Sequence, residues 1–423
     1  MAISNLYPAE GPTLNLNFAN SRTLDRRITF ERTTTGTYMG RDGLIKTAAA
    51  DEPRFDHRYQ NGQVESLGLL IEETSTNKFT QSIISNWGNP ANGTKTANAG
   101  LSPDNTSTAT LIEATSLNGQ TRIENGGETT PGRTYTLSCF CKAGTTDYCT
   151  FGLYELTDGA KNFQAIFYLT GEGTVTSESN CTATISAYTN GWYRCTMTIT
   201  LTAGASYSGS GWKLGVCNSP TAYYNADIGD NVYFWGAQLE SKAFATSYMP
   251  SPLDGQQGSR GADNAYMTDD NFSDWYNQSE GTFYANSTTN VSPNLFSGSI
   301  QPAILYATDG TSNNRIGMFY GPVNSIYTRI VSNGVQYGPS ESIIGSINTT
   351  KSIISYKTGT NGGGASINGS VVKLSTPNLL PAVNKLVIGI QATSNFGVLN
   401  GTMSQLTYYP TRLTNAQLQN LTK

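Results

Sequence analysis

The sequence predicts an all-β protein of more than one domain, and its composition, periodicity and length each support this. The 423 residues include 44 glycines and 24 tyrosines but only 13% charged side chains, which is typical of short strands joined by many turns. Long stretches with the period of an amphipathic helix are absent. A chain of this length is expected to form two or three domains, each able to bury its own core.

Residues 1–78 are predicted to form a small N-terminal β unit. Apolar and polar side chains alternate over residues 14–18 and 27–32, Asp42-Gly43 predicts a hairpin turn, and residues 66–72 are mostly apolar. Many of the charged residues of the chain lie here, including Arg22, Asp25, Arg26, Arg27, Glu31, Arg32, Arg41, Asp42, Arg54 and Asp56.

Residues 79–250 are predicted to form an antiparallel jelly-roll sandwich. Strand patterns recur at residues 107–112, 134–142, 148–154, 191–200 and 231–240. All six cysteines lie in this segment, at Cys139, Cys141, Cys149, Cys181, Cys195 and Cys217. Their spacing is not the C-x-x-C of a zinc site, and no secretion signal precedes them, so we expect buried free thiols, with a disulfide or a metal site as alternatives.

Residues 251–279 are predicted to be a linker, because residues 251–261 are rich in glycine and polar side chains. Residues 280–423 are predicted to form a second sandwich. Asn368-Gly369 predicts a tight hairpin turn, and Pro410 ends the last strand because it has no amide hydrogen to donate. Thr414 then caps a short helix that carries Leu418 and Leu421 on one face.

Three segments resemble known families. The strands and capped helix of residues 386–421 resemble the concanavalin A-like, laminin G-type lectin domain found at the C-terminus of bacteriophage tail-fibre and other virion proteins. The strands at 191–200 and 231–240, followed by residues 245–250, resemble the carbohydrate-binding-module jelly roll inserted in many phage fibres. The order of motifs in residues 24–72 resembles an N-terminal segment common in phage tail-fibre-like proteins.

These resemblances imply a tail-fibre or spike component of a bacteriophage virion that attaches to host cell-surface glycans. They also imply assembly in the host bacterial cytoplasm, a homotrimer, and contact with other virion proteins through residues 1–78. The alternative is a structural virion protein, such as a capsid decoration, head fibre or tail adaptor, whose lectin-like domains serve as assembly surfaces. Several linked binding sites would raise the apparent affinity of a weak single site.

Charge and hydropathy argue against two classes of partner. The net charge of −4 and the pI of about 5.2 give no attraction for phosphate backbones, so nucleic acid is not expected as a partner. No apolar run approaches the roughly 20 residues that cross a bilayer, so membrane insertion is not expected either.

The sequence offers little for catalysis, and we expect the chain not to be an enzyme. His57 is the single histidine, and its Phe-Asp-His setting favours a hydrogen-bonded structural role. The alternating carboxylates of a laminarinase-like glycosidase are absent; Glu155 and Asp158 come nearest but lie in a turn pattern. Glycan hydrolysis is kept as a remote alternative.

Exposed aromatic rings and polar loop groups are the usual means of holding a glycan. Candidates in the predicted jelly roll are Trp87, Trp212, Tyr223 and Tyr224, whereas Trp192 and Trp235 lie within strand patterns and are predicted to be buried. Candidates in the last segment are Tyr306, Asp309, Asn313, Asn314 and Arg315, which could hold a sugar hydroxyl or, through Asp309, calcium. An ordinary Asp-Gly turn is the alternative there. No cofactor is required by the pattern.

Overall fold

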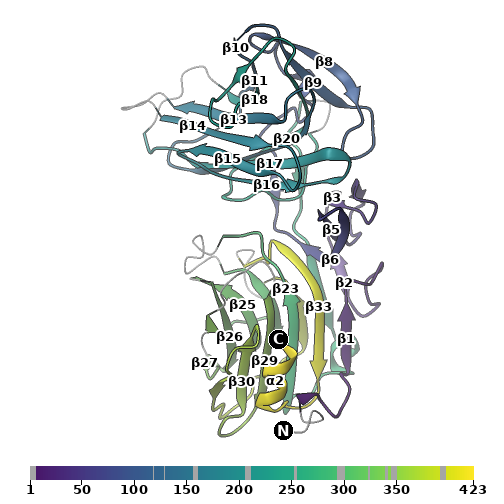
Figure 1. The fold of residues 1–423 in the computed structure, drawn as a ribbon. Coiled ribbons are helices and arrows are strands. Elements are labelled where there is room, and N and C mark those ends of the chain that lie inside the picture. The colour runs from purple at the N-terminus through teal and green to yellow at the C-terminus, as the bar shows by residue number, and fades with distance from the viewer. Residues whose placement is uncertain are drawn as a thin grey trace.

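The protein consists of two β-sandwiches stacked end to end, here called the upper and lower sandwich (Figure 1). The computed structural model describes residues 6–117, 119–127, 129–155, 161–204, 211–251, 255–292, 301–322, 324–338, 342–343, 350–390 and 397–423. Every strand pair in these ranges is antiparallel, so the predicted all-β, multidomain class is confirmed. Neither described α-helix, α1 (Asp270–Ser273) or α2 (Asn415–Leu421), is long and apolar enough to cross a membrane.

The lower sandwich consists of two facing eight-stranded sheets. The first, called the β33 sheet, has the order β31 (Lys373–Ser375), β30 (Gly363–Ile367), β29 (Thr350–Lys357), β23 (Glu280–Ser287), β33 (Gly401–Tyr409), β6 (Gln63–Ile71) and β5 (Phe55–Gln60), with β1 (Leu14–Asn17) also paired to β33. The second, the β24 sheet, has the order β2 (Thr29–Glu31), β22 (Asn264–Thr268), β32 (Lys385–Ile388), β24 (Ala303–Thr308), β25 (Arg315–Gly321), β26 (Ser325–Ser332) and β27 (Val335–Gln336), with β28 (Ser342–Ile343) also paired to β26.

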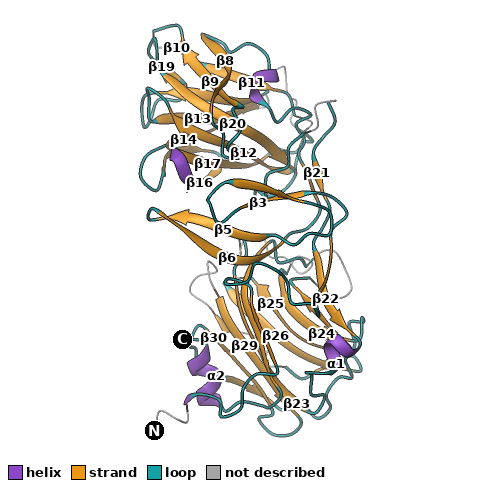
Figure 2. Ribbon diagram, turned by 90° about the vertical axis from the view of Figure 1, so that its right-hand side faces the viewer, coloured by secondary structure: helices purple, strands orange, loops and turns teal. Residues whose placement is uncertain are grey.

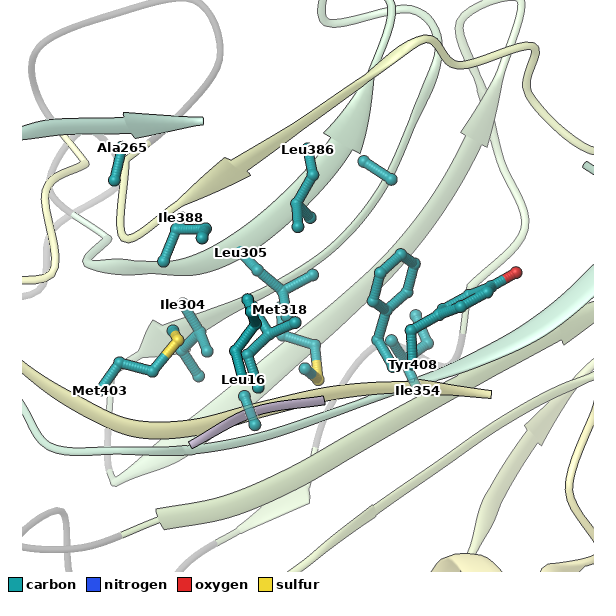
Figure 3. Close-up of a cluster of buried hydrophobic side chains, with 14 of the residues drawn as sticks. Leu16, Ala265, Ile304, Leu305, Met318, Ile354, Leu386, Ile388, Met403 and Tyr408 are labelled. Carbon is teal, nitrogen blue, oxygen red and sulfur yellow. The ribbon is translucent and has the colours of Figure 1, made fainter. Parts of the chain in front are cut away.

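The N-terminal segment is part of this lower sandwich. We expected residues 1–78 to form a unit of their own, but β1 pairs with β33 in the register Leu14↔Tyr408, β6 also pairs with β33, and β2 pairs with β22. The physical reason is the alternation in β1, which places Leu14 and Leu16 in the core with side chains from both sheets. Figure 3 shows Leu16 among these side chains, near Met403.

The upper sandwich is built from one continuous segment inserted between β7 (Ser75–Thr76) and β21 (Ser259–Arg260). The β13 sheet has the order β11 (Arg122–Asn125), β18 (Trp212–Cys217), β13 (Tyr148–Glu155), β14 (Lys161–Tyr168) and β15 (Thr174–Ser179). The β12 sheet has the order β16 (Thr182–Ala187), β17 (Trp192–Thr200), β12 (Thr134–Ala143), β20 (Asn231–Glu240), β9 (Ala109–Ala114) and β8 (Gly93–Gly100), while β10 (Gly119–Gln120) pairs with β19 (Asn225–Ala226). Short 3₁₀ turns lie at Ile84–Asn86 and Thr189–Gly191.

A hairpin from the N-terminal segment joins the two sandwiches. Strands β3 (Gly36–Met39) and β4 (Ile45–Ala48) lie between them, above β5 and β6 (Figure 2). Ile45 packs with Trp192 and Trp235 on the outer face of the β12 sheet, and the Thr189 hydroxyl donates to the Gly43 carbonyl at 2.8 Å. Trp192 and Trp235 are therefore buried as predicted, but at the junction of the sandwiches and not in the core of one of them.

A buried ionic network closes the same junction. Asp263 accepts from Arg32 at 3.1 Å and from Arg54 at 2.5 Å, while Glu72 pairs with Arg54 at 2.8 Å and with Arg260 at 3.3 Å. All five side chains are almost completely buried. Since β21 pairs with β7 and the network includes residues 260 and 263, this part of the expected linker is anchored in the described structure.

The C-terminal predictions are confirmed. Strand β33 ends at Tyr409, directly before Pro410. The Thr414 side chain accepts from the Gln417 amide and the Gln417 side chain accepts from the Thr414 amide, which is a capping box. Leu418 is buried against Ile353 on the outer face of the β33 sheet.

Candidate functional site

A cleft of about 930 Å³ lies between the two sandwiches. Its upper wall is the outer face of strands β16 and β17, and its lower wall comes from strands β5 and β6 with residues 288–292. The two walls of the cleft come from residues far apart in the sequence. The ionic network holds these parts of the chain together.

Threonine hydroxyls cover much of the upper wall. Odd-numbered residues of β17 face the core of the upper sandwich, so the even-numbered residues face outward. Thr184 and Thr196 share a hydrogen bond of 2.6 Å across β16 and β17, and Thr198 bonds Thr136 at 2.8 Å. A sheet face of this kind presents regularly spaced hydroxyl groups, each able to donate and accept.

Arg194 and Tyr188 form one end of the cleft, and the buried Phe140 ring lies behind them. The Arg194 guanidinium lies over the Phe140 ring, with 5.5 Å from Cζ to the ring centroid, and donates to the Ser138 hydroxyl at 3.1 Å. Phe140 meets Tyr188 edge to face at 5.0 Å. The structure shows no ion pair for Arg194 within its described part, and the Arg194 Nε has no hydrogen-bond partner there. Burial raises the pKa of Tyr188 to about 12, so its hydroxyl remains a neutral donor and acceptor.

Asp56 and His57 lie on the lower wall. The pairing of β5 with β6 is irregular between these two residues, and both side chains line the cleft. Asp56 accepts from the Met39 amide at 2.7 Å, and His57 Nδ1 lies 3.0 Å from the Met39 carbonyl oxygen, in agreement with the predicted structural role of His57. Burial raises the pKa of Asp56 to about 6, although the Met39 hydrogen bond lowers it.

The ionic network borders the cleft through Glu72. Burial alone would raise the pKa of the Glu72 carboxyl, but the charges of Arg260 and Arg54 and hydrogen bonds from Ser247 lower it to about 2. Glu72 is therefore ionised throughout the physiological range, whereas Asp56 titrates close to it. Two neighbouring carboxyl groups thus have opposite pKa shifts, because Glu72 forms ion pairs with Arg54 and Arg260 and Asp56 forms none among the described residues.

Four of the predicted glycan contacts are buried and cannot present a free ring face. Trp87 packs on Phe79 with ring centroids 5.2 Å apart, and Trp212 lies in the core of the upper sandwich. Tyr224 lies across two glycines of neighbouring strands, and Tyr306 lies across Gly317, where an added Cβ would be 2.1 Å from the Tyr306 ring. Because the neighbouring glycines have no side chain, these rings can pack directly against the sheet backbone. The polar residues adjacent to them in the sequence did not indicate this burial.

The remaining candidates lie outside the cleft. The partly exposed Tyr223 hydroxyl bonds Ser177 at 2.8 Å, and Arg315 lies over the Tyr306 ring. Asp309 accepts from the Thr311 amide and hydroxyl at 2.8 and 2.7 Å and from Asn314 at 2.9 Å.

That arrangement is the ordinary turn that was the alternative prediction. Asn313 is an exposed member of it, and its amide nitrogen donates to the Thr311 hydroxyl at 3.2 Å. Calcium takes six to eight oxygen ligands, and a single carboxylate engaged on both oxygens within its own loop does not fit that ion. Asp158 and the Glu155 side chain lie outside the described residues.

Sequence reasoning did not find the cleft. Asp56, Tyr188 and Arg194 come together only because the β3–β4 hairpin docks on the β12 sheet. The usable signal was the alternating threonine in residues 182–186 and 194–200, which predicts a polar outer face on two neighbouring strands.

No family model and no curated protein matches the chain. Solved structures with a similar fold include a heptameric pentraxin from Limulus polyphemus, 15% identical, with 34% of this chain and 70% of that chain covered and a TM-score of 0.26. Domains LG4-5 of the mouse laminin α1 chain are 7% identical, with 82% of this chain and 91% of that chain covered and a TM-score of 0.24. Trypanosoma rangeli sialidase in complex with sialic acid is 9% identical, with 74% of this chain and 60% of that chain covered and a TM-score of 0.29.

The expectation that the chain is not an enzyme is corrected by these comparisons, because sialidases are among the similar structures. The same likeness does not establish an activity, since it concerns the fold at low identity. The site is accordingly described by the groups that it presents: hydroxyls, the Tyr188 ring, one guanidinium and one carboxyl group of raised pKa.

Proposed function

We propose that this chain is a component of a bacteriophage tail fibre or spike and that the cleft between its sandwiches binds a glycan of the host surface. The single observation that carries the binding part is the cleft itself, with its hydroxyl-covered wall next to Arg194 and Tyr188. The virion part depends on the sequence resemblance of residues 24–72 and 386–421.

The cleft has the groups that a sugar ring needs. Thr184, Thr196 and Thr198 can exchange hydrogen bonds with sugar hydroxyls, and the partly exposed Tyr188 ring offers apolar contact to the ring carbons. The Arg194 guanidinium, which has no ion-pair partner among the described residues, suits a hydroxyl pair or a carboxylate of an acidic sugar. Binding of this kind is weak per site, and a homotrimer would raise it by avidity.

A pair of matched variants tests this proposal. Thr184→Trp places a large side chain on the cleft wall at one edge of the β12 sheet, and Thr96→Trp places the same side chain at the opposite edge, outside the cleft. Both positions are exposed on strands, where tryptophan is tolerated. We expect Thr184→Trp to weaken binding of the full chain to host cells by about tenfold or more, or about 1.4 kcal/mol, and Thr96→Trp to leave it unchanged.

Periodate treatment of the cells and competition with phage adsorption complete the test. Loss of binding after periodate supports a glycan receptor. Equal binding by wild type and Thr184→Trp would contradict the cleft as the site. Absence of binding by the wild-type trimer would make the structural virion role the leading account.

A further inference from the structure

Three cysteine side chains meet at one point inside the upper sandwich. Cys141 on β12 and Cys195 on β17 belong to one sheet, and Cys149 on β13 belongs to the facing sheet. Their sulfur atoms all lie within 4.8 Å of one another, and all three residues are fully buried. The two sheets therefore bring three sulfur donors together across the core.

The donor set is entirely soft. No histidine or carboxylate joins the three sulfurs in the part of the chain that the structure describes. Calcium and magnesium prefer oxygen ligands, and structural zinc is almost always held by four ligands. Thiol and thiolate sulfur selects soft ions such as Cu(I), and three converging donors suit an ion that accepts three-fold coordination.

The cluster lies in an apolar setting, because its three residues belong to the buried core of the upper sandwich. A charge placed in such a core is costly unless it is neutralised, so an ion of low charge is favoured.

We propose that Cys141, Cys149 and Cys195 form a binding site for one Cu(I) ion, which links the two sheets of the upper sandwich. Binding releases one thiol proton, so that the ion and the resulting thiolate together are neutral, and the other two sulfurs complete the coordination. No change of oxidation state is involved. The site lies in the core and not in the cleft, so it does not depend on the proposed glycan binding.

The test uses the full chain, refolded without oxygen in the presence of Cu(I) and then exposed to a chromogenic Cu(I) chelator. We expect one copper to remain per chain, with thiolate-to-copper charge-transfer absorption and a raised thermal midpoint of the upper sandwich. Cys149→Ser should lose the retained copper. Cys217→Ser is the matched control, because Cys217 is also buried but bonds the carbonyls of Ser219 and Ala222 and is not part of the cluster.

X-ray absorption spectroscopy of the wild-type chain keeps the proposal testable if Cys149→Ser does not fold. Three sulfur neighbours around copper support the site. Fewer than three sulfurs, retention of copper by a folded Cys149→Ser chain, or failure of the wild type to retain copper would each overturn it. Loss of copper from a folded Cys217→Ser chain would show that Cys217 is a ligand, and it would also overturn the proposal.

Discussion

The two sandwiches are built from the chain in opposite ways. The upper sandwich uses one continuous segment, and its core contains side chains from Phe79 to Leu239. The lower sandwich uses both ends of the chain, so that β1 and β6 lie beside β33, which is more than 300 residues away. The composition boundary near residue 78 therefore marks an insertion point and not the end of a folding unit.

Expressing the two parts of the chain separately should have the largest effect on folding. We expect residues 79–251 to fold alone, because their core is complete, and residues 264–423 to remain unfolded, because β33 would lose both β1 and β6. Circular dichroism and amide exchange of the two purified fragments measure this. A folded 264–423 fragment would contradict the shared-sandwich account.

Loss of one arginine should uncouple the sandwiches. Arg54 is fully buried and pairs with both Asp263 and Glu72, so Arg54→Ala leaves two acids without their partner and should cost about 3–5 kcal/mol of the free energy of unfolding. The control is Arg27→Ala, which breaks a partly exposed pair with Asp25 and should cost about 0–1 kcal/mol. Chemical denaturation measures both values, and equal costs would show that the network is not holding the junction.

Shortening one core leucine should lower the stability of only the sandwich to which that leucine belongs. Leu16→Ala and Leu137→Ala both shorten a buried leucine, and each should cost about 2–5 kcal/mol. Leu16→Ala should lower the transition of the lower sandwich and Leu137→Ala that of the upper, because the two leucines belong to different cores. Scanning calorimetry separates the two outcomes; a shift of both transitions by either variant would indicate a single cooperative unit.

The smallest expected effect is the pH dependence from Asp56. Its pKa is about 6 in the folded chain against 3.8 for an ordinary aspartate, so the folded state binds the extra proton more tightly. The resulting stability is present below pH 3.8 and is lost as the pH rises through about 6. Because Asp56 is partly exposed to the cleft, the change should be on the order of 1–3 kcal/mol.

Asp56→Asn should remove this dependence and raise stability at pH 7, since an amide oxygen can still accept from Met39. Denaturant unfolding at pH 4.5 and pH 7 tests it. Glu72 provides the contrast within the same cleft: its lowered pKa contributes stability above pH 4.5 that is lost as the pH falls through about 2. An unchanged pH profile in Asp56→Asn would assign the dependence to another group.

Local signals in the sequence predicted local structure well. The turn at Asn368-Gly369 has both residues at positive φ, the Thr414 cap is present, and the predicted strand at 231–240 coincides with β20. Pairing between distant strands could not be predicted in this way, because β1 carries the same alternation whether its neighbour is β2 or β33. The cleft was missed for the same reason, since Asp56 and Arg194 are brought together by docking and not by a motif.

The pairing of β7 with β21 places the two points where the upper sandwich leaves and rejoins the chain side by side. The segment between these strands therefore begins and ends at neighbouring positions. Recombination that exchanged this stretch for another domain with adjacent ends would leave the register of the lower sandwich intact. The fold therefore permits the upper sandwich to be replaced in evolution while the sequence of the lower sandwich stays the same.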